Sequence, residues 1–183
     1  ALLGFSSILE TSANTLSKEQ VAEYSNLIHC AAGQAFKLLE NLLDWSRLQM
    51  DKVEFDPQPV ALDEAVKASL FLFDPIAQAK DITLKADKAT GLSVTADRQM
   101  LDTILRNLIN NAIKFTPAGG DVSLTLNVIG ERTEVAVTDN GVGIAPEKID
   151  QLFLIEVKTS TRGTEGEAGT GLGLQLCKEL VEK

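Results

Sequence analysis

Hydrophobic residues divide the chain into a long heptad region and a second region in which helical and alternating patterns follow one another. From Lys18 to about Gln49 there is no proline, and apolar residues recur in alternating steps of three and four. This pattern predicts one long helix, and further leucines widen its apolar stripe so that it needs helical partners. The seam consists of Val21, Tyr24, Ile28, Ala31, Ala35, Leu38, Leu42 and Trp45.

A short apolar stretch over 2–9 precedes the long helix and ends at the polar segment Thr11–Ser17. We interpret this as the end of one helix, a turn, and the long helix running antiparallel to it. Two such helices are half of a four-helix bundle, so we expect a homodimer that completes the bundle. The alternative is a hairpin packed on the chain's own second domain.

The second region predicts a domain in which helices and strands alternate. Helices are expected over 62–77, from the N-cap Asp97 to 112, and over 172–181, with short strands near 82–86 and 92–95. Val122 to Val128 alternates strictly and continues across a turn at Gly130, which predicts a hairpin. We therefore expect an α/β sandwich with a mixed sheet at 61–183, joined by a linker at 51–60 to the helical hairpin at 1–50.

Composition narrows the classes of function. The 183 residues are 44% hydrophobic, enough for a sizeable core, and carry a net charge of −9, which disfavours a broad nucleic-acid footprint. His29 is the single histidine and Cys30 and Cys177 are the only cysteines, so zinc-finger spacing and a disulfide framework are absent. No apolar run reaches the ~20 residues of a membrane helix. We expect a cytoplasmic chain without membrane contact of its own.

The first candidate for chemistry lies on the helix predicted after Asp97. Asn107, Asn111 and Lys114 are spaced i, i+4 and i+7 and therefore share one face. Amide oxygens are hard ligands suited to Mg²⁺, and an ammonium neutralises phosphate oxygens, so this face could hold a metal–phosphate group. The alternative is an ordinary solvated polar face.

The second candidate is the segment DNGVGI, at Asp139–Ile144, after a predicted strand. Gly141 and Gly143 allow close ligand approach that a Cβ would block. An ionised carboxylate accepts hydrogen bonds and cannot donate them. On a pocket floor, Asp139 would therefore accept from the exocyclic amine of adenine and repel the carbonyl oxygen of guanine. The alternative is a plain Asn-Gly turn.

The third candidate is a glycine-rich stretch, Gly163–Leu174, that runs into the last predicted helix. Glycines just before a helix direct free N–H groups and the positive end of the helix dipole at an anion. The stretch fits neither a P-loop nor a dinucleotide fingerprint, because it lacks Gly-Lys-Ser/Thr and does not follow a strand.

The order of these three segments resembles that of a known family. NLINNAIKFTP, DNGVGI and GTGLGL resemble the N, G1 and G2 boxes of the sensor histidine kinases of two-component signalling, within the GHKL ATPases of Bergerat fold. LLGFSSILE and LLENLLDWSRLQMDK resemble the dimerisation and phosphotransfer domain of those kinases. The resemblance covers nearly the whole chain and implies a helical hairpin, a four-helix bundle on dimerisation, followed by a Bergerat-type α/β sandwich.

The resemblance also implies roles for the box residues. Asn111 would be the Mg²⁺ ligand, with Asn107 beside the phosphates of ATP. Lys114 would contact phosphate, and Asp139 would read adenine. The nucleotide pocket would be completed by Gly141, Gly143, Ile144, Gly169, Thr170, Gly171, Leu172 and Gly173.

A further part of the resemblance concerns the segment between the two glycine boxes. Phe153 looks like the F-box phenylalanine, and 154–168 looks like the ATP lid. Lys158 and Arg162 would then be lid cations near the phosphates, with two solvated charges as the alternative. The second phenylalanine common in the family's F box is missing, because Leu154-Ile155-Glu156-Val157 follows Phe153.

The acceptor histidine of the family is not found in its expected motif. By this resemblance it would lie roughly two helical turns before Ala1. His29 falls on the second helix without a matching motif or an acidic neighbour, so we predict that it is a bystander. The family also continues beyond Lys183, so both ends of the chain are expected to be cut.

The implied activity is that of an ATP-dependent protein histidine kinase, which passes the γ-phosphoryl group to a histidine and then to an aspartate of a response regulator. One alternative is an ATP-driven dimer clamp of the topoisomerase or mismatch-repair type, which the heptad helix and the acidic charge disfavour. Another is a non-enzymatic dimerisation module, which the intact boxes disfavour.

Overall fold

The computed structural model describes residues 2–12, 15–49, 54–87, 91–153, 161–167, 169 and 171–183. The chain forms two compact units, 1–46 and 47–183. Among the described helices, none combines the length and the apolar character needed to cross a membrane.

The first unit consists of α1 (Leu2–Ser12) and most of α2 (Lys18–Gln49), as the heptad pattern predicts. The Oγ of Ser17 accepts from the backbone N–H of Gln20 at 3.2 Å, and Oε1 of Gln20 accepts from the N–H of Ser17 at 2.9 Å. This reciprocal pair is a capping box that begins α2. Thr11, predicted to lie in the turn, is instead helical, since α1 extends to Ser12. In this position its hydroxyl donates to the carbonyl oxygen of Ser7 at 2.8 Å.

The helices of the first unit leave much apolar surface uncovered. Phe5 of α1 stacks on Tyr24 of α2, with ring centroids 5.7 Å apart. None of the described residues of α1 is buried, and Leu3 is 82% exposed. On α2, Leu39 and Leu43 are 55% and 57% exposed. Exposed apolar faces of this kind mark an interaction surface.

The second unit contains a mixed arrangement of strands, as predicted. β1 (Gln58–Ala61) pairs antiparallel with β3 (Ser93–Ala96). β2 (Thr83–Ala86) is parallel to β4 (Asp121–Ile129), and β4 forms the expected hairpin with β5 (Arg132–Asp139). β1 begins inside the segment predicted as linker. Pro59 is tolerated there because β1 has a strand on one side only, in a two-stranded sheet.

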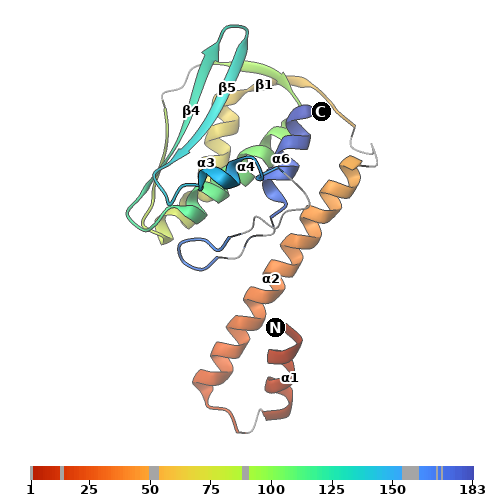
Figure 1. The fold of residues 1–183 in the computed structure, drawn as a ribbon, viewed down its shortest axis with the longest axis vertical. Coiled ribbons are helices and arrows are strands. Elements are labelled where there is room, and N and C mark those ends of the chain that lie inside the picture. The colour runs from red at the N-terminus through yellow and green to blue at the C-terminus, as the bar shows by residue number, and fades with distance from the viewer. Residues whose placement is uncertain are drawn as a thin grey trace. The chain divides into compact units, whose positions relative to one another are not determined.

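Helices cover one face of the three-stranded sheet β2-β4-β5 in Figure 1. α3 (Leu62–Ala79) and α4 (Arg98–Phe115) pack against each other and against strands, and α6 (Gly173–Glu182) packs on α4, while α5 (Pro146–Ile149) is a single turn. Val122 and Leu124 of β4 point into the core, and Leu105 and Ile109 of α4 meet them from the helical layer. Burial of each such side chain stabilises the fold by about 1.5–3 kcal/mol. α4 is therefore anchored in the core along one side.

Candidate nucleotide site

The beginning of α4 is fixed by the predicted N-cap, Asp97. Its Oδ1 accepts hydrogen bonds from the backbone N–H groups of Gln99 at 2.9 Å and Met100 at 3.0 Å, and its Oδ2 accepts from the N–H of Asp56 at 3.1 Å. The hydrogen bond from Met100 contributes most to lowering the pKa of Asp97 below its ordinary value. Burial acts to raise this pKa, and the bonds from Asp56 and Gln99 lower it further. The cap fixes the residue at which α4 begins, and the positions of the polar residues along the helix follow from it.

Two asparagines lie on the side of α4 that is not anchored in the sheet. The Nδ2 of Asn107 donates to the carbonyl oxygen of Thr103 at 2.9 Å, which orients its Oδ1 away from that bond. A Cβ on Gly173 would stand 2.8 Å from this Oδ1. Glycine is therefore needed for the beginning of α6 to approach Asn107 so closely. Asn111 is half-buried, one turn further along α4.

Lys114 is buried rather than solvated, with 8% of its surface exposed. Its Nζ donates to the carbonyl oxygen of Thr161 at 3.1 Å and lies 4.5 Å from the centroid of the Phe115 ring. Burial lowers the pKa of Lys114, the charge of Lys80 adds to this, and the charge of Glu167 opposes it. The ordinary solvated polar face considered above therefore does not describe Lys114.

The segment DNGVGI follows β5 and is bonded to the end of α4. The exposed carboxylate of Asp139 accepts from the N–H of Gly141 at 2.9 Å, and the N–H of Val142 donates to the carbonyl oxygen of Phe115 at 3.1 Å. A Cβ on Gly141 would overlap that same carbonyl oxygen. Gly143 has a positive φ of 67°. The predicted adenine-reading aspartate is thus tied to the helix that bears the two asparagines.

The glycine-rich stretch is bonded to the same end of α4. The N–H of Thr164 donates to the carbonyl oxygen of Lys114 at 3.1 Å, and its hydroxyl donates to the carbonyl oxygen of Thr116 at 3.0 Å. A Cβ on Gly163 would lie 2.6 Å from Cγ of Lys114. Downstream, Gly171 has a positive φ of 77°, and Leu172 is the N-cap of α6. The sequence did not single out Thr164, whose role depends on a partner 50 residues away.

The structure describes some of the remaining predicted site residues. Lys158 and Thr170 lie outside the described residues. Arg162 is exposed and follows Thr161, the residue that accepts from Lys114, and Phe153 is 43% exposed. Two further predicted residues, Ile144 and Gly169, are exposed as well.

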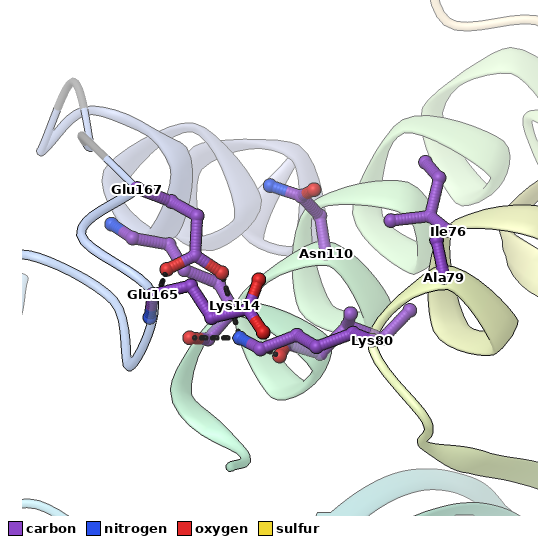
Figure 2. A pocket seen from close by; sticks show the side chains of 8 residues that line it. Ile76, Ala79, Lys80, Asn110, Lys114, Glu165 and Glu167 are labelled. Atoms are coloured by element: carbon purple, nitrogen blue, oxygen red, sulfur yellow. Dashed lines mark hydrogen bonds and ion pairs between the residues drawn. The ribbon is translucent and has the colours of Figure 1, made fainter. Parts of the chain in front are cut away.

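A pocket of about 330 Å³ lies beside the end of α4 (Figure 2). Of its charged residues, sequence reasoning identified Lys114 but assigned no role to Lys80, Glu165 or Glu167. Nζ of Lys80 donates to Oε1 of Glu167 at 2.6 Å and to the carbonyl oxygens of Ile113 and Lys114, each at 3.0 Å. No sequence pattern pairs Lys80 with Glu167, because they are 87 positions apart. The pocket is lined by Ile76, Ala79, Lys80, Asn110, Ile113, Lys114, Glu165 and Glu167.

Residues 96–183 match the family described as histidine kinase-, DNA gyrase B-, and HSP90-like ATPase. The second unit therefore contains an ATP-binding domain of this family, which bears out the predicted Bergerat-type fold. The comparison with individual proteins extends over the whole chain. The histidine protein kinase DivJ of Caulobacter vibrioides is 34% identical over 184 residues, a match that covers 100% of this chain and 30% of that protein.

Two solved structures extend the comparison. Full-length ShkA, crystallised in complex with AMPPNP, is 29% identical with a TM-score of 0.71, over 93% of this chain and 35% of that one. The histidine kinase ThkA, crystallised in complex with the response regulator protein TrrA, has a TM-score of 0.69 over 83% of this chain and 44% of that one. At 22% identity, ThkA shows the fold alone.

The chain therefore carries a catalytic domain of the kind found in sensor histidine kinases. The chain spans about a third of the length of the curated relatives it matches.

Proposed function

We propose that this chain is the catalytic part of an ATP-dependent protein histidine kinase, which transfers the γ-phosphoryl group of ATP to a histidine and from there to an aspartate of a response regulator. The observation that carries the proposal is the convergence of three segments on α4. Val142 bonds to Phe115, Thr164 bonds to Lys114, and Gly173 lies against Asn107.

The groups gathered on α4 fit a nucleotide triphosphate with Mg²⁺. Asn111 and Asn107 offer amide oxygens, which are the hard ligands that Mg²⁺ prefers, and Asn111 is proposed as its protein ligand. Bound Mg²⁺ would supply charge neutralisation at the phosphate oxygens. Lys114 adds an ammonium that would exchange the carbonyl oxygen of Thr161 for a phosphate oxygen. The N–H groups at the beginning of α6 would face the same anion.

Asp139 is proposed as the residue that selects adenine. The N–H of Gly141 holds its Oδ1 at 2.9 Å and so fixes the direction of the carboxylate. A carboxylate in this position would accept a hydrogen bond from the exocyclic amine of adenine and repel the carbonyl oxygen of guanine. Gly141 and Gly143 would let the base approach the backbone closely. At Gly141 a side chain would also collide with the end of α4.

Phosphoryl transfer needs positioning and charge neutralisation more than covalent help from the protein. The acceptor histidine is predicted to precede Ala1 in the helical bundle, and His29, an exposed residue of α2, is predicted to take no phosphoryl group. Residues 1–50 would serve dimerisation, because the exposed leucines of α2 need a partner. The ThkA complex with a response regulator supports a receiver domain as the next acceptor.

The proposal is tested by a phosphorylation assay with two versions of the chain. This chain is mixed with radiolabelled ATP, Mg²⁺ and a version extended at its N-terminus by the segment predicted to hold the acceptor histidine. Acid-labile label should appear on the extended chain only. It should be lost when Asn111→Ala is present in both chains and kept with Asn127→Ala, a change on the exposed part of β4. Stable label on His29 would contradict the proposal.

A further inference from the structure

The ammonium of Lys80 has a full set of partners in the interior. Lys80 is the C-cap residue of α3, and its side chain is 5% exposed. Its three N–H donors match three acceptors: the carbonyl oxygens of Ile113 and Lys114 at the end of α4, and the carboxylate of Glu167 (Figure 2). The positive charge also faces the negative end of the α4 dipole, which stabilises it there.

Glu167 uses its second carboxylate oxygen to close a short loop. Oε2 accepts from the N–H of Glu165 at 2.8 Å, and the backbone carbonyl of Glu167 accepts from the N–H of Gly163 at 2.9 Å. We call Gly163–Glu167 the closed loop. Burial acts to raise the pKa of Glu167, but hydrogen bonds from Lys80 and from backbone N–H groups, with the charge of Lys80, hold it below its ordinary value. Glu167 is therefore ionised at neutral pH.

The closed loop is the first part of the glycine-rich stretch and is seated on α4, and the rest of the stretch follows it in the chain. Thr164 bonds to the carbonyl oxygens of Lys114 and Thr116. Two residues after Glu167 comes Gly169, and the chain reaches the beginning of α6 at Gly173, beside Asn107. The stretch proposed to surround the phosphates thus starts at the closed loop.

We propose that Lys80 and Glu167 are positioning residues of the nucleotide site, which hold the closed loop on α4 and so fix where the glycine-rich stretch meets the phosphates. This inference rests on the proposed function. Loss of Glu167 leaves the buried ammonium of Lys80 without its counter-charge, although its two carbonyl partners remain. Loss of Lys80 frees the carboxylate of Glu167, which is 36% exposed, to turn toward water. In both cases the closed loop loses its ion pair with the end of α3. Groups that are ordered before binding bind more tightly than groups that must be ordered by the ligand.

The test is a double-mutant cycle on nucleotide affinity with Lys80→Met, Glu167→Gln and the double variant. Each single change should weaken binding of Mg·ATP and Mg·ADP roughly tenfold, and the double variant should lose no more than the worse single one. Affinity for adenosine should stay at the wild-type value, because Asp139 is not part of the loop. That difference between nucleotide and nucleoside is not expected from a general loss of folding.

Two sets of controls accompany the cycle. Lys80→Arg retains the charge and the donors and should keep most of the wild-type nucleotide affinity. This variant keeps the inference testable if Lys80→Met folds poorly. The pair Lys85–Asp121 has an N–O distance of 3.0 Å but is solvent-exposed, with exposed fractions of 59% and 49%. Lys85→Met should therefore leave nucleotide affinity unchanged.

Specific outcomes would overturn the inference. Wild-type ATP affinity in both Lys80→Met and Glu167→Gln would do so, and so would additive losses or an equal loss for adenosine. Tighter ATP binding by the variants would mean that the loop competes with the phosphates, which is the opposite of positioning. If the wild-type chain bound no ATP, the proposed function would fail together with this inference.

Discussion

The backbone N–H of Val142 donates a hydrogen bond of 3.1 Å to the carbonyl oxygen of Phe115, the last residue of α4. Carbonyl groups in the last turn of a helix have no partner within it, so the segment after β5 satisfies one of them. The same bond fixes the distance between Asp139, which precedes Val142, and the asparagines of α4. The residue proposed to bind the adenine base and the residues proposed to bind the phosphates would therefore be held at a fixed distance from each other.

Gly141→Ala should destabilise the second unit and weaken nucleotide binding. A methyl group at Gly141 would overlap the carbonyl oxygen of Phe115, and a backbone atom cannot rotate away as a side-chain end can. We expect a loss of about 1–3 kcal/mol in the free energy of unfolding, measured by urea denaturation. Val142→Ala is the control, because Val142 is 68% exposed and keeps its backbone N–H. Equal stability of Gly141→Ala and wild type would contradict this account.

Asp97→Ala should cost about 1 kcal/mol of stability at neutral pH through loss of the α4 cap. Since the pKa of Asp97 is lowered in the folded chain, its contribution is complete above the unfolded pKa of about 3.9 and is lost as pH falls through the folded pKa. The difference between wild type and Asp97→Ala should therefore shrink in acid. Urea titrations at several pH values measure it, with Glu131→Ala in the exposed hairpin turn as control. A difference that grows in acid would refute the capping role.

Cys177 should be unreactive in the folded chain. Burial raises the pKa of its thiol to about 11, so almost no thiolate forms near neutral pH. Cys30 is exposed on α2. A thiol reagent should therefore modify one cysteine in buffer and both in denaturant, as counted by mass spectrometry. Rapid modification of Cys177 in buffer would show that the contact of α6 with α4 opens readily.

Leu39→Asp combined with Leu43→Asp should dissociate the expected dimer. Both side chains are more than half exposed on α2, beside the predicted seam. In a four-helix bundle they would be buried, and burying two unpaired carboxylates there would cost more free energy than packing the helices together gains. Sedimentation equilibrium should give a dimer for wild type and a monomer for the double variant. Phe71→Asp, on α3 with 84% exposure, should remain dimeric. A wild-type monomer would remove the bundle from the account.

Periodicity and local chemistry predicted the elements that depend on neighbouring residues. The strict alternation along Val122–Val128 predicted the β4–β5 hairpin, and Asp97 was recognised as the cap of α4 because it immediately precedes an apolar helical pattern. The resemblance of the three boxes to those of sensor histidine kinases predicted the ATPase family that the comparisons bear out.

Contacts between distant segments were beyond the sequence pattern. Lys80 ends an amphipathic helix, where a lysine is ordinarily solvated, and its carbonyl partners on α4 appear only when α3 and α4 pack together. Lys114 was placed on a polar face, but its ammonium bonds to the carbonyl oxygen of Thr161, and Gly163 of the closed loop lies against its side chain. Most of β1 was predicted as linker because Pro57 and Pro59 weaken the strand signal, although pairing with β3 outweighs that preference.

The central claim is that the end of α4 is an ATP site, and calorimetric titration with ATP in the presence of Mg²⁺ tests it most directly. Wild type should bind one ATP per chain. Asn111→Ala should lose most of the Mg²⁺-dependent affinity, and Asp139→Asn should bind ATP at least about tenfold more weakly and discriminate less against GTP. Asn127→Ala should match wild type. No binding by wild type, or wild-type affinity in both site variants, would contradict the account.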